Sequence, residues 1–227
     1  MNSEILTFKH KPKLGDIIYS LPLIKYLGGG ILYLDPESEF FKGQKGQWIE
    51  KYNWLIPLIK TQSYIHDVKI YEGEDFAIDL DKYMNTTHLQ KGDKVNIVDN
   101  HFVGQGMKPL GYEPWLNAKR IKSSKIIVAN SSNYHDDIDY YKLLKGKLFG
   151  FVGTDQEAYD FRQRCKIEFT HFGVTDSRML AELINGCEIF IGNQSLPLAI
   201  ALGLGKKCWV EQSEIYPNCI MGKYRKL

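Results

Sequence analysis

The sequence predicts an α/β protein built from two domains. Short apolar runs alternate with helical patterns along the chain, and this alternation is typical of parallel sheets covered by helices. It occurs twice, once on each side of an irregular stretch at residues 111–124. The clearest unit runs from Cys187 to Glu211, where a strand, a polar turn, a helix and a second strand follow one another.

Length and composition agree with this class and exclude others. The chain has 227 residues, which is enough for two small domains. Its net charge of +2 is too close to neutral to indicate nucleic-acid binding by itself. No apolar run approaches the roughly 20 residues of a membrane span, and the first residues lack the apolar stretch of a signal peptide. We therefore expect a cytoplasmic protein with no membrane span.

The four cysteines predict neither a zinc site nor a redox motif, because none of them belongs to a Cys-x-x-Cys pair. Cys187 and Cys208 lie beside predicted buried strands. We expect both to be small core residues.

The first half begins with a predicted βαβ unit. A strand over residues 5–8 leads through a loop into an amphipathic helix from Gly15 to Leu27, and a second strand spans residues 31–34. Such a unit pairs its strands in parallel, with a right-handed crossover. The other elements predicted here are a helix at 48–59, strands at 65–71, 76–80 and 95–98, and a helix at 101–110.

The second half continues the alternation. Strands are predicted at 125–129, 148–152, 169–172, 188–191 and 207–210, and helices at 138–144, 155–165, 176–185 and 196–204. Thr154 or Asp155 is expected to cap the second of these helices, and Thr175 or Asp176 the third. The stretch 111–124 contains Pro, Gly and a charge cluster without a clear period, which is typical of a linker. We therefore expect an N-terminal domain at residues 1–115 and a C-terminal domain at residues 116–227.

The turn after the strand at 188–191 is a candidate site. Residues 192–195, Gly-Asn-Gln-Ser, join this strand to a helix whose first turn contains Pro197. Open α/β sheets bind ligands at the carboxyl ends of their strands, and a helix N-terminus favours phosphate. The same turn also occurs in domains that bind nothing there, so its shape alone leaves both interpretations open.

Asp16 is the second candidate, because it lies in the first turn of the first predicted helix. The helix dipole favours a carboxylate there by about 0.3–1 kcal/mol, so a purely structural role is one interpretation. The other is a general base at the mouth of a cleft, which would take a proton from an attacking hydroxyl. Lys13, three residues earlier, is either an exposed lysine or a phosphate contact.

Two segments resemble signatures of the heptosyltransferase-like glycosyltransferases, glycosyltransferase family nine. The first signature is G-D-hydrophobic-hydrophobic-x-(S/T)-x-P-hydrophobic-hydrophobic, and it is matched by Gly15, Asp16, Ile17, Ile18, Ser20, Pro22, Leu23 and Ile24. The second begins G-N-D-S-G-P-x-H-L-A, and it is matched by Gly192, Asn193, Ser195, Pro197 and Ala201, while Gln194, Leu196 and Ala199 replace its Asp, Gly and His. Weaker matches are Asn130-Ser131-Ser132 and Gly153-Thr154, each after a predicted strand.

The resemblance implies a GT-B fold, in which two Rossmann-like domains face a central cleft. It also implies an inverting, metal-independent glycosyltransferase that uses a nucleotide-diphosphate sugar as donor and needs no other cofactor. Asp16 would be the catalytic base. The donor site would comprise Gly15, Ser131, Ser132, Thr154, Asn193, Gln194 and Ser195, with Lys13 as a candidate phosphate contact. Asp79-Leu-Asp81 has the form of a metal-binding D-x-D motif, but it follows a predicted strand and is more simply a strand-end turn.

The donor sugar and the acceptor stay open. GT-B enzymes related to bacteriophage DNA glycosyltransferases act on hydroxymethylated bases, and Trp48, Lys51, Tyr52, Trp54 and Lys60 could contact nucleic acid. A second alternative is a catalytically inactive nucleotide-sugar-binding protein, because Gln194 and Ala199 replace an acidic residue and a histidine of the family signature.

Overall fold

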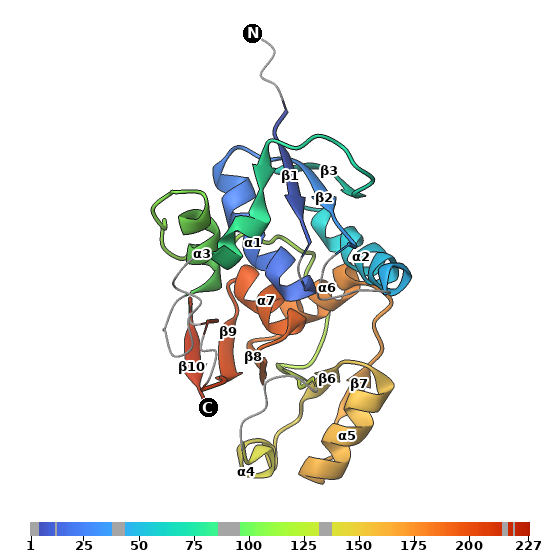
Figure 1. The fold of residues 1–227 in the computed structure, drawn as a ribbon. Helices are drawn as coiled ribbons and strands as arrows, with labels where there is room; N and C mark the ends of the chain where they lie inside the picture. The colour runs from blue at the N-terminus through green and yellow to red at the C-terminus, as the bar shows by residue number, and fades with distance from the viewer. Residues whose placement is uncertain are drawn as a thin grey trace.

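The computed structural model describes residues 5–11, 13–37, 44–85, 96–131, 138–214, 218–219 and 221–227. Two parallel sheets organise these residues, and Figure 1 shows one sheet above the other with helices between them. The strands of the first sheet end at Asp79, and those of the second begin at Ile126. The domain boundary expected between residues 115 and 116 falls between the two sheets, and its exact position stays a prediction.

The first sheet has the strand order β3-β2-β1-β4, and its strands pair in parallel. Phe8 lies opposite Leu32 in the register of β1 and β2, in agreement with the expected βαβ unit. The elements of this half are β1 (Thr7–His10), α1 (Leu14–Tyr26), β2 (Gly30–Leu34), α2 (Lys45–Ile59), β3 (Ile65–Ile70), β4 (Ile78–Asp79), the 3-10 helix η2 (Leu80–Asn85) and α3 (Ile97–Gly104).

The second sheet has the order β10-β9-β8-β5-β6-β7, also with parallel pairs. Thr154 caps the helix α5 and Asp176 caps α6, as predicted. Cys187 and Cys208 are buried, as expected. The elements are β5 (Ile126–Ala129), α4 (Tyr140–Leu144), β6 (Gly150–Val152), α5 (Asp155–Cys165), β7 (Thr170–Phe172), α6 (Ser177–Gly186), β8 (Ile189–Asn193), α7 (Leu196–Gly203), β9 (Lys207–Glu211) and β10 (Tyr224–Lys226).

Two segments differ from the prediction. The strand expected at 95–98 is wrong, because Asn96 caps α3 and its side chain accepts a hydrogen bond from the N–H of Val98 at 2.8 Å. A short apolar run cannot distinguish a strand from a helical turn by its period. The helix expected at 101–110 therefore starts earlier, and it ends at Gly104. Near the C-terminus, β10 forms an edge strand that the sequence pattern did not indicate.

Helices α1 and α7 pack against each other between the sheets (Figure 1). The predicted amphipathic character of α1 is wrong, because the consecutive residues 17–21 are all buried. In α7 the consecutive residues 198–203 are buried as well. A helix that is apolar on all sides is one that is buried on all sides, and both helices belong to a hydrophobic core shared by the two halves. Among the described residues, none of the helices combines the length and apolar character that a membrane crossing requires.

The predicted linker is packed into this core. Pro22 lies inside α1 and has no N–H, so the carbonyl of Ile18 loses its usual helical partner. The indole Nε1 of Trp115 donates a hydrogen bond to this carbonyl at 3.0 Å. The backbone N–H groups of Trp115 and Leu116 both donate to the carbonyl of Gly203 in α7, each at 2.9 Å. The predicted linker is thus hydrogen-bonded to both α1 and α7.

A buried hydroxyl joins α2 to α6. Ser177, the first residue of α6, donates from Oγ to the carbonyl of Leu55 at 2.8 Å and accepts from the N–H of Leu58 at 3.2 Å. Pro57 lies between these two positions and interrupts the regular hydrogen bonding of α2. The hydroxyl of one half is therefore bonded to the backbone of the proline-containing helix of the other.

We expect Ser177→Ala to lower the free energy of unfolding by about 1–3 kcal/mol, because buried backbone groups of α2 lose this partner. Urea unfolding followed by circular dichroism measures the change. Ser63→Ala is the matched control, since Ser63 is exposed, and it should change the free energy by less than about 0.5 kcal/mol. Equal effects of the two substitutions would contradict a joint at Ser177.

Candidate active site

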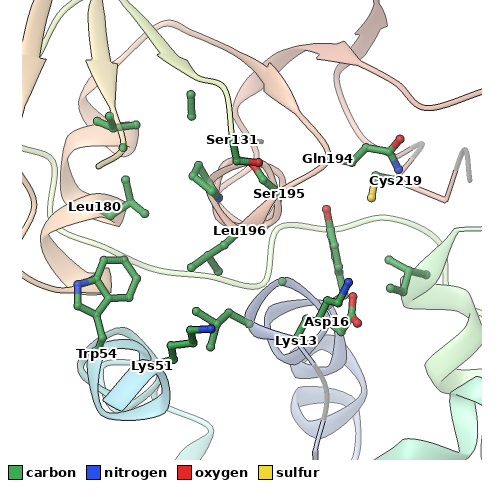
Figure 2. Close-up of a pocket in the computed structure, with 18 of the residues that line it drawn as sticks. Lys13, Asp16, Lys51, Trp54, Ser131, Leu180, Gln194, Ser195, Leu196 and Cys219 are labelled. Atoms are coloured by element: carbon green, nitrogen blue, oxygen red, sulfur yellow. The ribbon is translucent and has the colours of Figure 1, made fainter. Parts of the chain in front are cut away.

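A cleft of about 740 Å³ lies where the two halves of the chain meet. Figure 2 shows it between α1 and α2 on one side and the second half of the chain on the other. The predicted site residues that line it are Lys13, Gly15 and Asp16 from the first half, and Ser131, Thr154, Gln194 and Ser195 from the second. The structure thus brings the two segments that carry the family resemblance to one cleft.

The two segments approach each other closely at Gly15. A β-carbon placed on Gly15 would lie 3.9 Å from the backbone nitrogen of Leu196, the first residue of α7. That distance is an ordinary van der Waals contact. The first turns of α1 and α7 are therefore direct neighbours at the floor of the cleft.

Asp16 lies in the first turn of α1 and is partly buried. Its Oδ2 accepts a hydrogen bond from the hydroxyl of Tyr83 in η2 at 3.1 Å. Burial raises the pKa of Asp16, and the Tyr83 hydrogen bond and the charges of His10 and Lys13 oppose only part of this effect. A carboxylate with a raised pKa is a stronger proton acceptor than an exposed one, which suits a general base.

A buried polar cluster lies behind Asp16 and was not found from the sequence. Tyr83 stacks on His101 with ring centroids 4.3 Å apart, and His10 packs edge-on against both rings. Burial lowers the pKa of His101 well below its ordinary value, so this ring is neutral at pH 7. Burial alone would raise the pKa of Asp81, but the hydrogen bond and charge of His10, the backbone N–H of Lys11 and the charge of Lys9 together outweigh it and lower that pKa.

The Asp79-Leu-Asp81 segment is a strand-end turn, as expected. The Oδ1 of Asp79 accepts the N–H of Asp81 at 3.0 Å. The Oδ1 of Asp81 in turn bonds Nδ1 of His10 at 2.9 Å and accepts the N–H of Lys11 at 3.0 Å. Both carboxylates therefore form hydrogen bonds with groups of the first half of the chain.

Asn193 was predicted to contact the donor, whereas the structure gives it a positioning role. Its side chain is fully buried at the end of β8. The Oδ1 accepts the N–H of Ser131 at 3.1 Å, and the Nδ2 donates to the carbonyl of Ser131 at 2.9 Å. These two bonds tie the end of β5 to the end of β8. Of these two residues, Ser131 lines the cleft, and Asn193 holds its backbone in place.

Gln194 lines the cleft, and its carboxamide bonds to residues near the C-terminus. The Nε2 donates to Oδ1 of Asn218 at 2.9 Å, and the Oε1 accepts the N–H of Ser213 at 2.6 Å. The carbonyl of Asn218 accepts the N–H of Ile97, at the start of α3, at 2.9 Å. The residue that replaces the Asp of the family signature therefore supports another bridge between the two halves.

The remaining predicted donor residues lie at strand ends. Ser195 is the N-cap residue of α7. Thr154 is the N-cap residue of α5, where it forms a capping box with Glu157. Ser132 falls outside the described residues. Donor binding by this set stays a prediction.

Comparison with known proteins identifies the fold. Neither a family model nor a curated protein sequence matches the chain. Among solved structures, it is similar to Escherichia coli ADP-heptose LPS heptosyltransferase II, with a TM-score of 0.67 and 13% identity over 98% of this chain and 90% of that one. The chain has the heptosyltransferase fold. A family 9 glycosyltransferase from Veillonella parvula shares it, with a TM-score of 0.62 and 12% identity over 98% of this chain and 85% of that one.

Escherichia coli heptosyltransferase WaaC, solved with ADP-2-deoxy-2-fluoro heptose, has the heptosyltransferase fold as well. Its TM-score is 0.56, and its identity is 9% over 90% of this chain and 87% of that one. The expected fold class, a GT-B protein with two Rossmann-like domains at a central cleft, is therefore confirmed. At these identities the similarity establishes the fold alone.

We expect Tyr83→Phe to raise the pKa of Asp16 further, because it removes a hydrogen bond that stabilises the carboxylate. NMR titration of the carboxyl carbon measures this pKa, with Asp16→Asn to assign the signal. Tyr33→Phe is the matched control, since Tyr33 is a buried tyrosine of β2. An unchanged or lower pKa of Asp16 in Tyr83→Phe would contradict the role given to the Tyr83 hydroxyl.

Proposed function

We propose that this chain is a glycosyltransferase that moves a sugar from a nucleotide-diphosphate sugar to an acceptor hydroxyl. The observation that carries the proposal is the cleft in which the two signature-like segments face each other within a heptosyltransferase fold. Structures of WaaC, a protein of that fold, were solved with ADP and with a fluorinated ADP-heptose. This supports a nucleotide sugar as the donor.

The strand order supports a position for the donor. Strands β8, β5, β6 and β7 are neighbours in the second sheet. Ser195 follows β8, Ser131 follows β5 and Thr154 follows β6, so polar groups lie at three adjacent strand ends. The N-terminus of α7 favours the diphosphate at β8. At about 4.8 Å per strand, β7 lies about 14 Å from β8, which suits the length of an extended nucleoside diphosphate. The nucleoside would therefore lie toward β7.

Asp16 would act as the general base. Its carboxylate takes the proton of the acceptor hydroxyl while the hydroxyl oxygen attacks the anomeric carbon and the bond to the diphosphate breaks. Such a single displacement inverts the anomeric carbon. Lys13 and the N-terminus of α7, both at the cleft, would stabilise the charge on the leaving diphosphate. These groups would serve the reaction without a metal.

The nucleic-acid acceptor considered above receives no support from the structure. Tyr52 is fully buried and Trp48 nearly so. Lys60 forms an ion pair with Asp67 at 3.3 Å. The aromatic and basic residues of α2 therefore do not form one exposed nucleic-acid-binding surface, and we propose a carbohydrate or another small hydroxyl compound as acceptor.

We expect Asp16→Asn to reduce sugar transfer by about 10²–10⁴-fold, because an amide cannot accept the proton. Nucleoside diphosphate binding should be retained. Release of the nucleoside diphosphate from ADP-, UDP- and GDP-sugars in the presence of candidate acceptors measures turnover, and calorimetry measures binding. Near-normal turnover in this variant would remove Asp16 from the mechanism.

Asp99→Asn is the matched control for this experiment. Asp99 also lies, partly buried, in the first turn of a helix, and burial raises its pKa too. It does not belong to the cleft wall, so its variant should keep full turnover. A wild-type protein that binds nucleotide sugars and never turns them over would instead favour the catalytically inactive alternative.

Asp16→Asn should also stabilise the protein, and more so as the pH rises. When the pKa of a carboxyl group is higher in the folded than in the unfolded state, the free energy of unfolding of the protein falls as the pH rises through the interval between the two values. For Asp16 this interval begins at the ordinary value of 3.8 and extends upward. Thermal unfolding at pH 4 and pH 7 measures the difference between variant and wild type. A larger gain at pH 4 would contradict the raised pKa.

A further inference from the structure

We propose that α2 of the first half forms the second wall of the nucleotide site, with Trp54 covering the base and Lys51 contacting the diphosphate. This inference rests on the proposed function and adds to it residues outside both signature-like segments. Neither residue was a candidate for donor binding from the sequence.

The cleft-facing side of α2 presents three residues at regular spacing. Lys51 is three positions from both Trp48 and Trp54, so it neighbours each of them on the helix surface, and all three line the cleft. In Figure 2, Trp54 points toward Leu180 of α6, and Lys51 lies between Trp54 and Asp16. The indole and the ammonium therefore face different parts of the same cleft.

The part of the cleft opposite Trp54 is apolar. Val152 ends β6, Val174 follows β7, and Leu180 lies in α6, and all three line the cleft. Val152 and Val174 lie at the β6–β7 end of the sheet, separated by β5 from the N-terminus of α7, which favours the diphosphate. An apolar wall facing a half-buried indole forms a slot for a flat aromatic group. The nucleobase is the flat aromatic part of the proposed donor.

The charges of the cleft point to Lys51 as a phosphate ligand. Among the described lining residues, Glu157 is the one charged side chain of the second half, whereas the lysines, Lys11, Lys13 and Lys51, all come from the first half. A diphosphate bound on the second half must therefore obtain side-chain cations from across the cleft. The Nζ of Lys51 lies 4.3 Å from the ring centroid of Trp48, a cation–π contact that orients the ammonium and leaves its charge in place.

The width of the slot is fixed by the joint between α2 and α6. Ser177 bonds Leu55, the residue next to Trp54, and Leu180 lies one helical turn after Ser177. Trp54 and Leu180 are thus held in place from both helices before any ligand arrives. A preorganised slot binds without the entropic cost of ordering its walls.

Calorimetry with ADP, UDP and GDP, and with adenosine, uridine and guanosine, tests the proposal on the full chain. Base stacking on an aromatic side chain predicts that Trp54→Leu weakens binding of the preferred nucleoside diphosphate by about 5–150-fold. Trp54→Phe should retain most of the affinity, because it keeps an aromatic face. Lys51→Met should weaken binding of the preferred nucleoside diphosphate and leave binding of the corresponding nucleoside unchanged. Lys45→Met is the control, since Lys45 is an exposed lysine of α2 that pairs with Glu37, outside the cleft wall.

The outcomes separate this inference from the proposed function. A wild-type protein that binds no nucleoside diphosphate would overturn both. Wild-type binding that is unchanged in Trp54→Leu and Lys51→Met would overturn the inference alone. Normal nucleotide affinity with a raised KM for the acceptor would place α2 in the acceptor site and would also overturn it. If Trp54→Leu unfolds in circular dichroism, the Lys51→Met and Trp54→Phe results decide.

Discussion

The packing of α1 against α7 is the constraint on which the rest of the structure depends. The central turns of both helices are buried on all sides, so each helix covers its own sheet and also the other helix. The N-terminal ends of the two helices carry Asp16 and the N-cap residue Ser195 to the cleft. The contact that completes the core therefore also sets the separation between a carboxylate and a helix N-terminus. Stability and site geometry come from the same residues.

The side chains that hold the cleft wall lie one layer behind it. Tyr83 bonds Asp16, and Asn193 holds the backbone of Ser131 through two hydrogen bonds. Buried polar groups of this kind must find partners within the protein, which restricts their rotamers and those of the residues they touch. The cleft is thus shaped by residues that a ligand would not contact. Conservative changes in this layer would alter the site without removing any lining residue.

The sequence predicted features whose information is local. Thr154, one of the two residues predicted to cap α5, lies directly before the helix, and its partner in the capping box, Glu157, is three residues away. The two signature-like segments were likewise visible as short patterns. Tyr83, by contrast, lies 67 positions from Asp16, and Ser177 lies 122 positions from Leu55. A local sequence pattern cannot predict partners that lie so far apart along the chain. The missed start of α3 has another cause, since a short apolar run fits a strand and a helical turn equally well.

The joint at Ser177 and the packed linker at Trp115 have a consequence for how this chain acquires its structure. Domains joined by small polar interfaces usually fold as separate units. Here each half leaves the outer surface of its central helix uncovered until the other half arrives. Contacts between residues more than a hundred positions apart must therefore form before either core is complete, and such high contact order slows folding. A chain cut at the linker would yield two aggregation-prone fragments instead of two independently folded proteins.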